Sequence, residues 1–295
     1  MSSIHWNVEF SSGELKLRGV LQLADGDGPH PIVVMAHGQG GLKEWPNLPS
    51  VSAALVAAGI ATLAFDYRNF GDSEGSVRDD VDFPGQVEDF QNAISFATTL
   101  KNIDSDRIGI WGTSLGGRNA LLVAARDKRV KCVVSQVPAL VMAKEMLSYM
   151  GGCSGDVAAF EQALADDKRD RAAGKEPRYV YIAGEDLSAS DFEHIRSFGE
   201  AETRNWNRRF SYQSLDPDGF FDIANEISNI IAPLRFILVD HDYCAPMSKV
   251  SGFYEILPEP KSMVVMPGLH YDFYTHGKEL STNSAREWFV EHLKP

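Results

Sequence analysis

The chain has 295 residues, with 28 Lys and Arg against 41 Asp and Glu, and its net charge is −13. This acidic balance argues against nucleic acid and membranes as partners, because nucleic acid and anionic lipid surfaces both carry negative charge. The length allows one large domain or two smaller ones, and the 44% hydrophobic content is ordinary for a globular protein. We expect no membrane span, since no apolar run approaches the ~18 residues that a spanning helix needs.

The cysteine pattern and residues 1–6 provide evidence about the cellular compartment. Cys132, Cys153 and Cys244 are widely spaced, and none belongs to a C-x-x-C pair. A disulfide framework is therefore not expected, and a reducing compartment is favoured. The stretch 1–6 has no basic segment followed by an apolar one, so we expect no signal peptide. These observations predict a cytoplasmic location.

Apolar runs along the chain predict alternating strands and helices. Residues 5–10 and 14–24 indicate two strands joined by a turn, which is typical of an opening antiparallel hairpin. The later strands are predicted at 32–36, 60–65, 107–111, 132–137, 235–239 and 262–266, and helices at 51–58, 84–100, 119–125 and 247–257. Continuous apolar strands separated by helices predict an α/β fold with a doubly wound, mostly parallel sheet and right-handed crossovers.

The alternation of strands and helices is interrupted over residues 139–231. This segment has helical patterns, and residues 179–182 are its candidate for a short strand. We interpret it as a mainly helical insertion that packs over the sheet as a lid. The remaining parts, 1–138 and 232–295, are expected to form the core of a single catalytic domain.

The stretch 112–117, Gly-Thr-Ser-Leu-Gly-Gly, places Ser114 between a predicted strand and a predicted helix. Glycine two positions before and two positions after Ser114 suits a sharp strand-to-helix turn, because the backbone there leaves no room for bulk. This placement is typical of a nucleophile elbow. The G-x-S-x-G pattern by itself is moderately specific, and its position between a strand and a helix strengthens the prediction.

A serine hydroxyl needs a neighbouring base, which a carboxylate holds in the right tautomer. In a doubly wound sheet these groups converge at the carboxyl ends of strands. Of the eight histidines, His270 follows a buried-type strand and is the predicted base. Asp240 and Asp242 both follow the 235–239 strand; we favour Asp242, and the choice between them stays open. The order Ser114, Asp242, His270 is the one expected of an α/β-hydrolase fold.

Acyl transfer also needs hydrogen-bond donors for the oxyanion of a tetrahedral intermediate. Leu115 follows the nucleophile and offers one backbone N–H, and Gln39, in a glycine-rich loop after a strand, offers a second. The alternative that these glycines only form a tight turn stays open. His37, Gly40 and Arg118 are candidates for the substrate pocket.

Nucleotide and metal sites find little support in the sequence. The stretch 112–117 has the glycine spacing of a P-loop, but Arg118 and Asn119 stand where Lys and Ser or Thr belong. The loop at 38–43 lacks the last glycine of a dinucleotide fingerprint. There is no H-E-x-x-H and no Cys/His cluster at ligand spacing, so we expect neither a metal nor another cofactor.

Several stretches resemble the α/β-hydrolase superfamily in sequence order. They are His37 to Gly41, Phe65 to Ser73, Gly112 to Gly117, Asp242 with Pro246, and Gly268 to Tyr274. The set is similar to a branch that contains dienelactone-hydrolase-like proteins, Xaa-Pro-peptidase-like hydrolases and fungal polyketide transferases. It covers residues 15–138 and 232–294, and within the insertion Trp206 and Asn207 look familiar.

The resemblance implies Ser114, Asp242 and His270 as a catalytic triad. Two positions depart from the family pattern. Asp240 ends the acid strand where relatives often have glycine, which leaves the choice of acid open, and Arg118 stands where a small residue or His is commoner.

We therefore expect a serine hydrolase that cleaves an ester or a thioester through an acyl-enzyme on Ser114. The resemblance leaves open acyl transfer or carbon–carbon condensation in secondary metabolism, because one fold hosts many chemistries. A non-catalytic small-molecule binder is a third alternative. The expected partner is a small-molecule acyl substrate. The sequence does not identify its acyl or leaving group, and it leaves lid movement and the formation of a homo-oligomer open.

Overall fold

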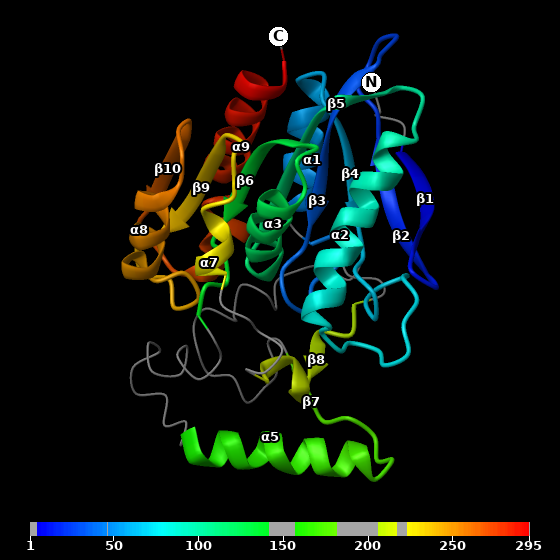
Figure 1. Cartoon of the computed structure of the whole chain (residues 1–295), viewed down its shortest axis with the longest axis vertical. Helices are drawn as coiled ribbons and strands as arrows, with labels where there is room; N and C mark the ends of the chain where they lie inside the picture. Colours follow the sequence, from blue (N-terminus) through cyan, green and yellow to red (C-terminus); the bar gives the residue numbers. More distant parts are fainter. Residues whose placement is uncertain (1–4, 46, 142–156, 182–205, 217–222, 295) are drawn as a thin grey trace.

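The computed structural model describes residues 5–45, 47–141, 157–181, 206–216 and 223–294. Its main sheet has eight strands. They are β1 His5–Ser12, β2 Leu15–Gln22, β3 His30–Ala36, β4 Ala61–Phe65, β5 Ile103–Thr113, β6 Val130–Gln136, β9 Leu234–Val239 and β10 Lys261–Met266. Across the sheet they follow the order β1-β2-β4-β3-β5-β6-β9-β10 (Figure 1).

The pairing of the strands confirms the predicted sheet. β1 and β2 form an antiparallel hairpin, and β2 pairs antiparallel with β4. All pairs from β4 to β10 are parallel. Every residue of β3 is buried, because helices cover both faces of the sheet and a continuous apolar run suits that environment. The chain therefore has an α/β-hydrolase fold with an opening antiparallel hairpin.

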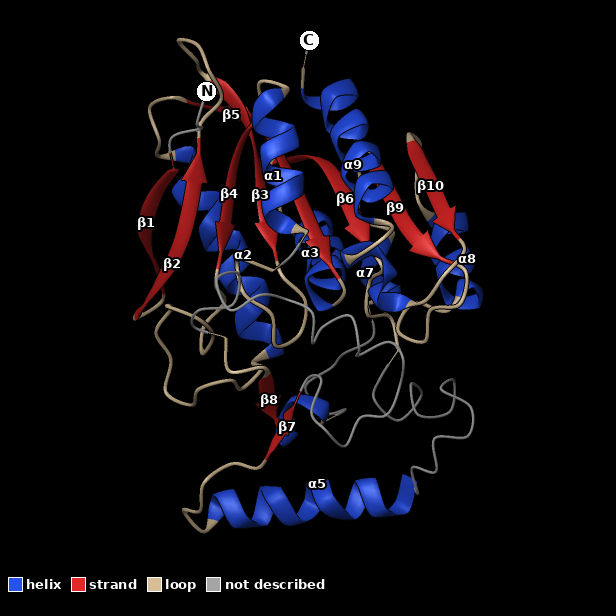
Figure 2. Cartoon of the chain, turned by 180° about the vertical axis from the view of Figure 1, so that it is seen from behind, coloured by secondary structure: helices blue, strands red, loops and turns tan. Residues whose placement is uncertain are grey.

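Five helices cover the two faces of this sheet. They are α1 Leu48–Ala57, α2 Phe83–Thr98, α3 Leu115–Arg126, α8 Met247–Ile256 and α9 Lys278–Leu293. Figures 1 and 2 show α2, α3 and α8 over one face and α1 and α9 over the other. α2 starts as its sequence predicts, with Pro84 in the first turn and the Asp82 carboxylate accepting from the Gly85 N–H. α1 starts at Leu48, three residues before the predicted helix, because Pro49 also suits a first turn.

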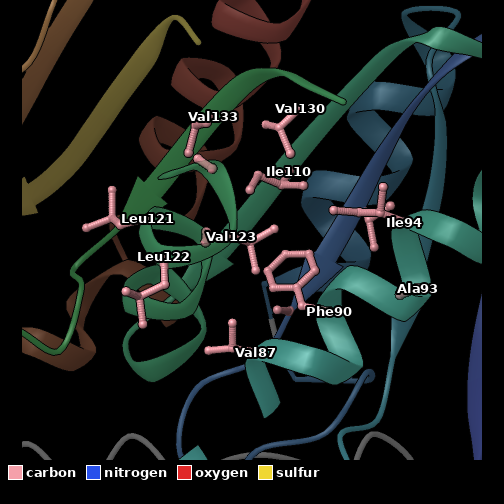
Figure 3. Packing of buried hydrophobic residues seen from close by; sticks show 14 of the residues in the cluster. Val87, Phe90, Ala93, Ile94, Ile110, Leu121, Leu122, Val123, Val130 and Val133 are labelled. Atoms are coloured by element: carbon pink, nitrogen blue, oxygen red, sulfur yellow. The ribbon is translucent and has the colours of Figure 1, made fainter. Parts of the chain in front are cut away.

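The larger hydrophobic cluster lies between the sheet and helices α2 and α3. Phe90 and Ile94 of α2 point toward Ile110 of β5 and Val123 of α3 (Figure 3). All four side chains are fully buried. This packing holds α2 and α3 against the same face of the sheet.

The described part of the insertion contains two helices, two strands and a 3-10 helix. They are α5 Val157–Ala172, β7 Tyr179–Tyr181, β8 Arg209–Ser211, η2 Tyr212–Leu215 and α7 Ala224–Ile227. β7 matches the predicted short strand, and it pairs antiparallel with β8, which the sequence did not predict. In Figures 1 and 2, α5, β7 and β8 lie beyond the carboxyl ends of the parallel strands. That the insertion acts as a lid stays a prediction, as do the boundaries of the core.

Two further expectations concern membranes and disulfides. Over the described ranges, none of the helices combines the length and the apolar character needed to cross a bilayer. Cys132 and Cys244 are buried free thiols, and Cys153 lies outside the described residues.

Candidate active site

Ser114 occupies a strained turn between β5 and α3. Its backbone has φ 54° and ψ −121°, a conformation that non-glycine residues rarely adopt. The turn is tight because glycines flank it: a Cβ at Gly112 would overlap the carbonyl oxygen of Gly116, and one at Gly116 would overlap that of His37. The Ser114 N–H donates to the carbonyl of Gln136 over 2.9 Å. The predicted strand, turn and helix are therefore present, with the hydroxyl-bearing residue at the bend.

The structure brings Ser114, His270 and Asp242 together from three different loops. His270 Nε2 lies 3.1 Å from Ser114 Oγ. His270 Nδ1 lies 2.9 and 3.0 Å from the two carboxylate oxygens of Asp242. Asp242 follows β9, and His270 opens the 3-10 helix η4 His270–Tyr274. The resulting chain of hydrogen bonds runs from hydroxyl to imidazole to carboxylate.

The surroundings of Asp242 hold its carboxylate in place. Asp242 Oδ1 accepts from the backbone N–H of Cys244 over 2.7 Å and of Ala245 over 3.0 Å. Both Asp242 and His270 are buried. Burial lowers the pKa of His270, but the charge of Asp242 and its hydrogen bond outweigh that effect and hold the pKa well above its ordinary value. Because Asp242 binds Nδ1–H, Nε2 faces the serine.

Asp240, the other acid left open by the sequence, lies outside this chain of hydrogen bonds. Its carboxylate accepts from the Gly268 N–H over 3.0 Å and lies 2.6 Å from Nδ1 of the exposed His241. Asp240 thus braces the loop that leads to His270, while Asp242 contacts the imidazole.

The loop after β3 forms a tight turn beside Ser114, and we call residues 38–41 the oxyanion turn, after the role that we propose for it below. The Gly41 N–H donates to the Gly38 carbonyl over 3.0 Å, and Gly40 has φ +67°, as the third position of a type II turn requires. A Cβ at Gly38 would lie 3.0 Å from Ser114 Cβ, so this turn adjoins the serine.

The backbone N–H groups of Leu115 and Gln39 are the two candidates for binding an oxyanion. Leu115 is the first residue of α3, so its N–H has no acceptor within the helix. The Gln39 N–H donates to no backbone carbonyl in the part of the chain that the structure describes. Their use in an oxyanion hole stays a proposal.

The three candidates for the substrate pocket lie in different environments. His37 is fully buried, its Nδ1 lies 2.8 Å from the Gly38 carbonyl, and its Nε2 accepts from the Tyr67 N–H over 3.4 Å. Burial lowers the pKa of His37, which favours the neutral ring. Arg118 is fully buried on α3. The Gly40 carbonyl accepts from the indole N–H of Trp206, within the insertion, over 2.5 Å.

Sequence reasoning missed the residues that support the site. Thr113 Oγ1 lies 2.6 Å from Tyr274 Oη, which joins the residue before Ser114 to the end of the helix that His270 begins. The signal was present in the Gly268 to Tyr274 stretch, but periodicity alone does not show which aromatic residue reaches back to β5.

A buried ion pair ties the loop after β3 to the loop after β4. Lys43 Nζ lies 2.6 Å from Asp66 Oδ2 and 2.7 Å from Asp72 Oδ2, and the Lys43 N–H donates to Asp66 Oδ1 over 2.8 Å. This ion pair joins the two loops. It fixes the residues that directly follow the oxyanion turn.

Among the described residues, Asp242, Cys244 and His270 form the one group close enough to hold a metal ion, with donor atoms within 4.8 Å of one another. Hydrogen bonds already join the Asp242 oxygens to His270 Nδ1. Burial raises the pKa of the Cys244 thiol, which disfavours the thiolate that binds metals. The group therefore suits proton transfer better than metal binding.

Comparisons with known proteins identify a family model, sequence relatives and a solved structure that are similar to this chain. The sequence model of a family described as X-Pro dipeptidyl-peptidase (S15 family) matches residues 20–272. The quorum-quenching protein AidA of Acinetobacter baumannii is 43% identical over 132 residues, which are 45% of this chain and 43% of AidA. That match spans less than half of either protein. Thiohydrolase aneE of Aspergillus aculeatus is 30% identical over 270 residues, 87% of this chain and 83% of aneE.

A third relative has a solved structure. Polyketide transferase grgF of a Penicillium species is 26% identical over 298 aligned residues, 97% of this chain and 96% of grgF. The crystal structure of the α/β hydrolase GrgF superimposes with a TM-score of 0.80 and 24% identity, covering 98% of this chain and 99% of GrgF. The superposition shows the shared fold.

Proposed function

Because the chain belongs to the X-Pro dipeptidyl-peptidase (S15) family and has an α/β-hydrolase fold, we propose that it is a serine hydrolase that cleaves an ester or a thioester. The observation that carries this proposal is the continuous hydrogen bonding from Ser114 through His270 to Asp242. Thiohydrolase aneE, which aligns with 87% of this chain, supports the thioester as a substrate class. The proposed partner is a small-molecule acyl compound.

In the proposed mechanism, Ser114 Oγ attacks the carbonyl carbon and its proton passes to His270 Nε2. Asp242 keeps the proton on Nδ1 and stabilises the imidazolium. The backbone N–H groups of Gln39 and Leu115 bind the oxyanion of the tetrahedral intermediate. Collapse of that intermediate expels the alcohol or thiol, which takes the proton from His270, and leaves an acyl group on Ser114. His270 then takes a proton from a water molecule as the water oxygen attacks the acyl carbon. Collapse of this second tetrahedral intermediate breaks the bond to Ser114 Oγ, which takes the proton back from His270, and the acid is released.

The proposal is tested with a panel of p-nitrophenyl esters and acyl thioesters, with an X-Pro p-nitroanilide as a peptidase substrate. We expect a Ser114→Ala variant to lose about 10⁴- to 10⁶-fold in kcat while it folds normally. Ser228→Ala, at an exposed site on the surface, is the matched control and keeps wild-type turnover. Intact-mass measurement on the wild type should trap an acyl adduct. Full activity of Ser114→Ala would remove the assignment.

Acyl transfer is the second candidate, and the relationship to a polyketide transferase favours it. In that case an alcohol or an amine, and not water, takes the acyl group from Ser114. Adding such acceptors and looking for a transfer product separates the two reactions. A non-catalytic binding role would instead leave Ser114 unlabelled by a fluorophosphonate probe.

A further inference from the structure

The oxyanion turn is bound by the insertion as well as by the core. The Trp206 indole N–H donates to the Gly40 carbonyl over 2.5 Å. The side-chain amide of Gln39 donates to the Ser214 carbonyl over 3.2 Å. Trp206 and Ser214 belong to one short segment of the insertion, residues 206–216. Two consecutive residues of the turn are therefore held by a segment more than 160 positions away in the sequence.

The composition of the turn explains why it needs such contacts. Three of its four residues are glycine, and glycine loses more conformational freedom on ordering than any other residue. The bond from the Gly41 N–H to the Gly38 carbonyl closes the turn. The chain that follows the turn is fixed by the contacts of Lys43 with Asp66. The Gly40 carbonyl lies between these two constraints, and Trp206 is its donor.

The segment 206–216 is itself attached firmly to the core. The Asn207 side chain donates to both carboxylate oxygens of Asp79 over 3.0 and 3.1 Å, and Arg209 Nε donates to Asp79 Oδ2 over 2.8 Å. The Val81 N–H donates to Ser214 Oγ over 2.9 Å. These bonds attach both halves of the segment to the loop before α2, so the segment can act as a fixed support.

The Trp206 ring also reaches toward the helix that carries the base. It packs edge-on against Trp45 at 5.0 Å between ring centroids, and Trp45 packs edge-on against Tyr274 at 5.5 Å. Tyr274 ends the helix that starts at His270. The indole thus has two separable features: an apolar ring packed among aromatics and an N–H directed at the oxyanion turn.

We propose that Trp206 is a positioning residue, whose N–H holds the oxyanion turn in the geometry that presents the Gln39 N–H to the oxyanion. Segment 206–216 then completes the oxyanion hole, in addition to any role of the insertion in covering the substrate. This inference rests on the proposed serine hydrolase function, because an oxyanion forms only if Ser114 attacks a carbonyl.

The test is a Trp206→Phe variant, which loses the N–H and keeps an aromatic ring against Trp45. Removing an oxyanion donor outright lowers kcat about 10²- to 10³-fold, so we expect misplacing one to lower kcat about tenfold with KM changed less than about twofold. The affinity for a boronic acid, which forms a tetrahedral adduct with the serine, should fall by the same factor. Hydrogen exchange in the peptide that contains residues 38–41 should accelerate. Trp6→Phe, at an exposed position on β1, is the matched control with none of these effects.

Two results would overturn the inference. One is a Trp206→Phe variant with wild-type kcat and unchanged exchange in the turn. The other is a variant in which kcat and thermal stability fall and KM rises, while boronate affinity relative to substrate affinity stays constant, since that pattern marks a merely structural residue. Either result leaves the proposed function standing as long as Ser114→Ala is inactive. An active Ser114→Ala variant contradicts the proposed function instead.

Discussion

Two opposing effects set the pKa of the His270 imidazole. Burial favours the neutral ring, whereas the Asp242 carboxylate favours the charged ring, and the carboxylate prevails. A base whose pKa is raised stays protonated, and therefore inactive, up to a higher pH. The interaction between the protonated His270 and Asp242 also stabilises the folded chain. At pH values below the ordinary histidine pKa this stabilisation is fully present, and it is lost as the pH rises through the raised pKa.

The pH dependence of activity follows from this balance. We expect the acidic limb of kcat/KM to have its midpoint above 6.5, the ordinary value for histidine. Asp242→Asn should lower that midpoint, because the charge is gone, and should cut kcat about 10⁴-fold, because the amide favours the wrong tautomer. The measurement is kcat/KM for an ester from about pH 5 to about pH 9. Asp240→Asn is the control, and an equal shift in both variants would contradict the pairing of Asp242 with His270.

At the scale of elements, the short helix η4 decides where the imidazole lies. Tyr274 is buried at its end, with Oη 2.6 Å from Thr113 Oγ1. Gln136 Nε2 donates to the same Thr113 oxygen over 3.2 Å, and its backbone carbonyl accepts the Ser114 N–H. Burial raises the pKa of Tyr274, so the phenol stays neutral. This small buried network sets η4 against the end of β5, and so sets His270 against Ser114.

Removing one hydroxyl tests that coupling. Tyr274→Phe keeps the ring against Trp45 and leaves the Thr113 hydroxyl with one partner fewer. We expect a loss of about 1 to 2 kcal/mol in the free energy of unfolding, the usual cost at a buried hydroxyl pair. We also expect a reduced kcat at nearly constant KM, because the base is displaced from the nucleophile. Urea denaturation and steady-state kinetics measure the two effects. The control is Tyr254→Phe on α8, whose hydroxyl, among the described residues, donates only to the Lys261 carbonyl of β10 over 3.4 Å; it should show neither effect.

The elements differ in how far their sequences predict them. β3 is predictable because all its residues are buried and its apolar run is continuous. β8 is not, because three residues carry no periodic signal. Asp240 and Asp242 both follow β9, and their roles separate only through the hydrogen bond to His270. The contact between Trp206 and Gly40 depends on how the insertion folds back, which no local pattern encodes.

For the whole molecule, the parallel sheet separates two hydrophobic clusters. One lies under α2 and α3, and the other under α1 and α9. The Ser114, Asp242 and His270 side chains come from loops at the carboxyl ends of strands, outside the middle of both clusters. Stability and catalysis therefore rest on largely different residues, and substitutions in the two regions should act independently.

Phe90→Ala tests this separation. Phe90 is fully buried between α2 and the sheet, with its ring 5.6 Å from that of Phe65. Truncating a buried Phe costs about 3 to 5 kcal/mol, which we expect to see as a lower midpoint in urea denaturation. Below the unfolding transition, kcat should stay within about twofold of wild type, as expected for distant, independent sites.

The partly exposed Phe96, on the same helix, provides the matched truncation. Phe96→Ala should lose less stability, because its ring is already in contact with water and its removal leaves no closed cavity. Should Phe90→Ala instead lower kcat in proportion to its loss of stability, the cluster under α2 would have to hold the elbow directly. The separation between the core and the site would then be wrong.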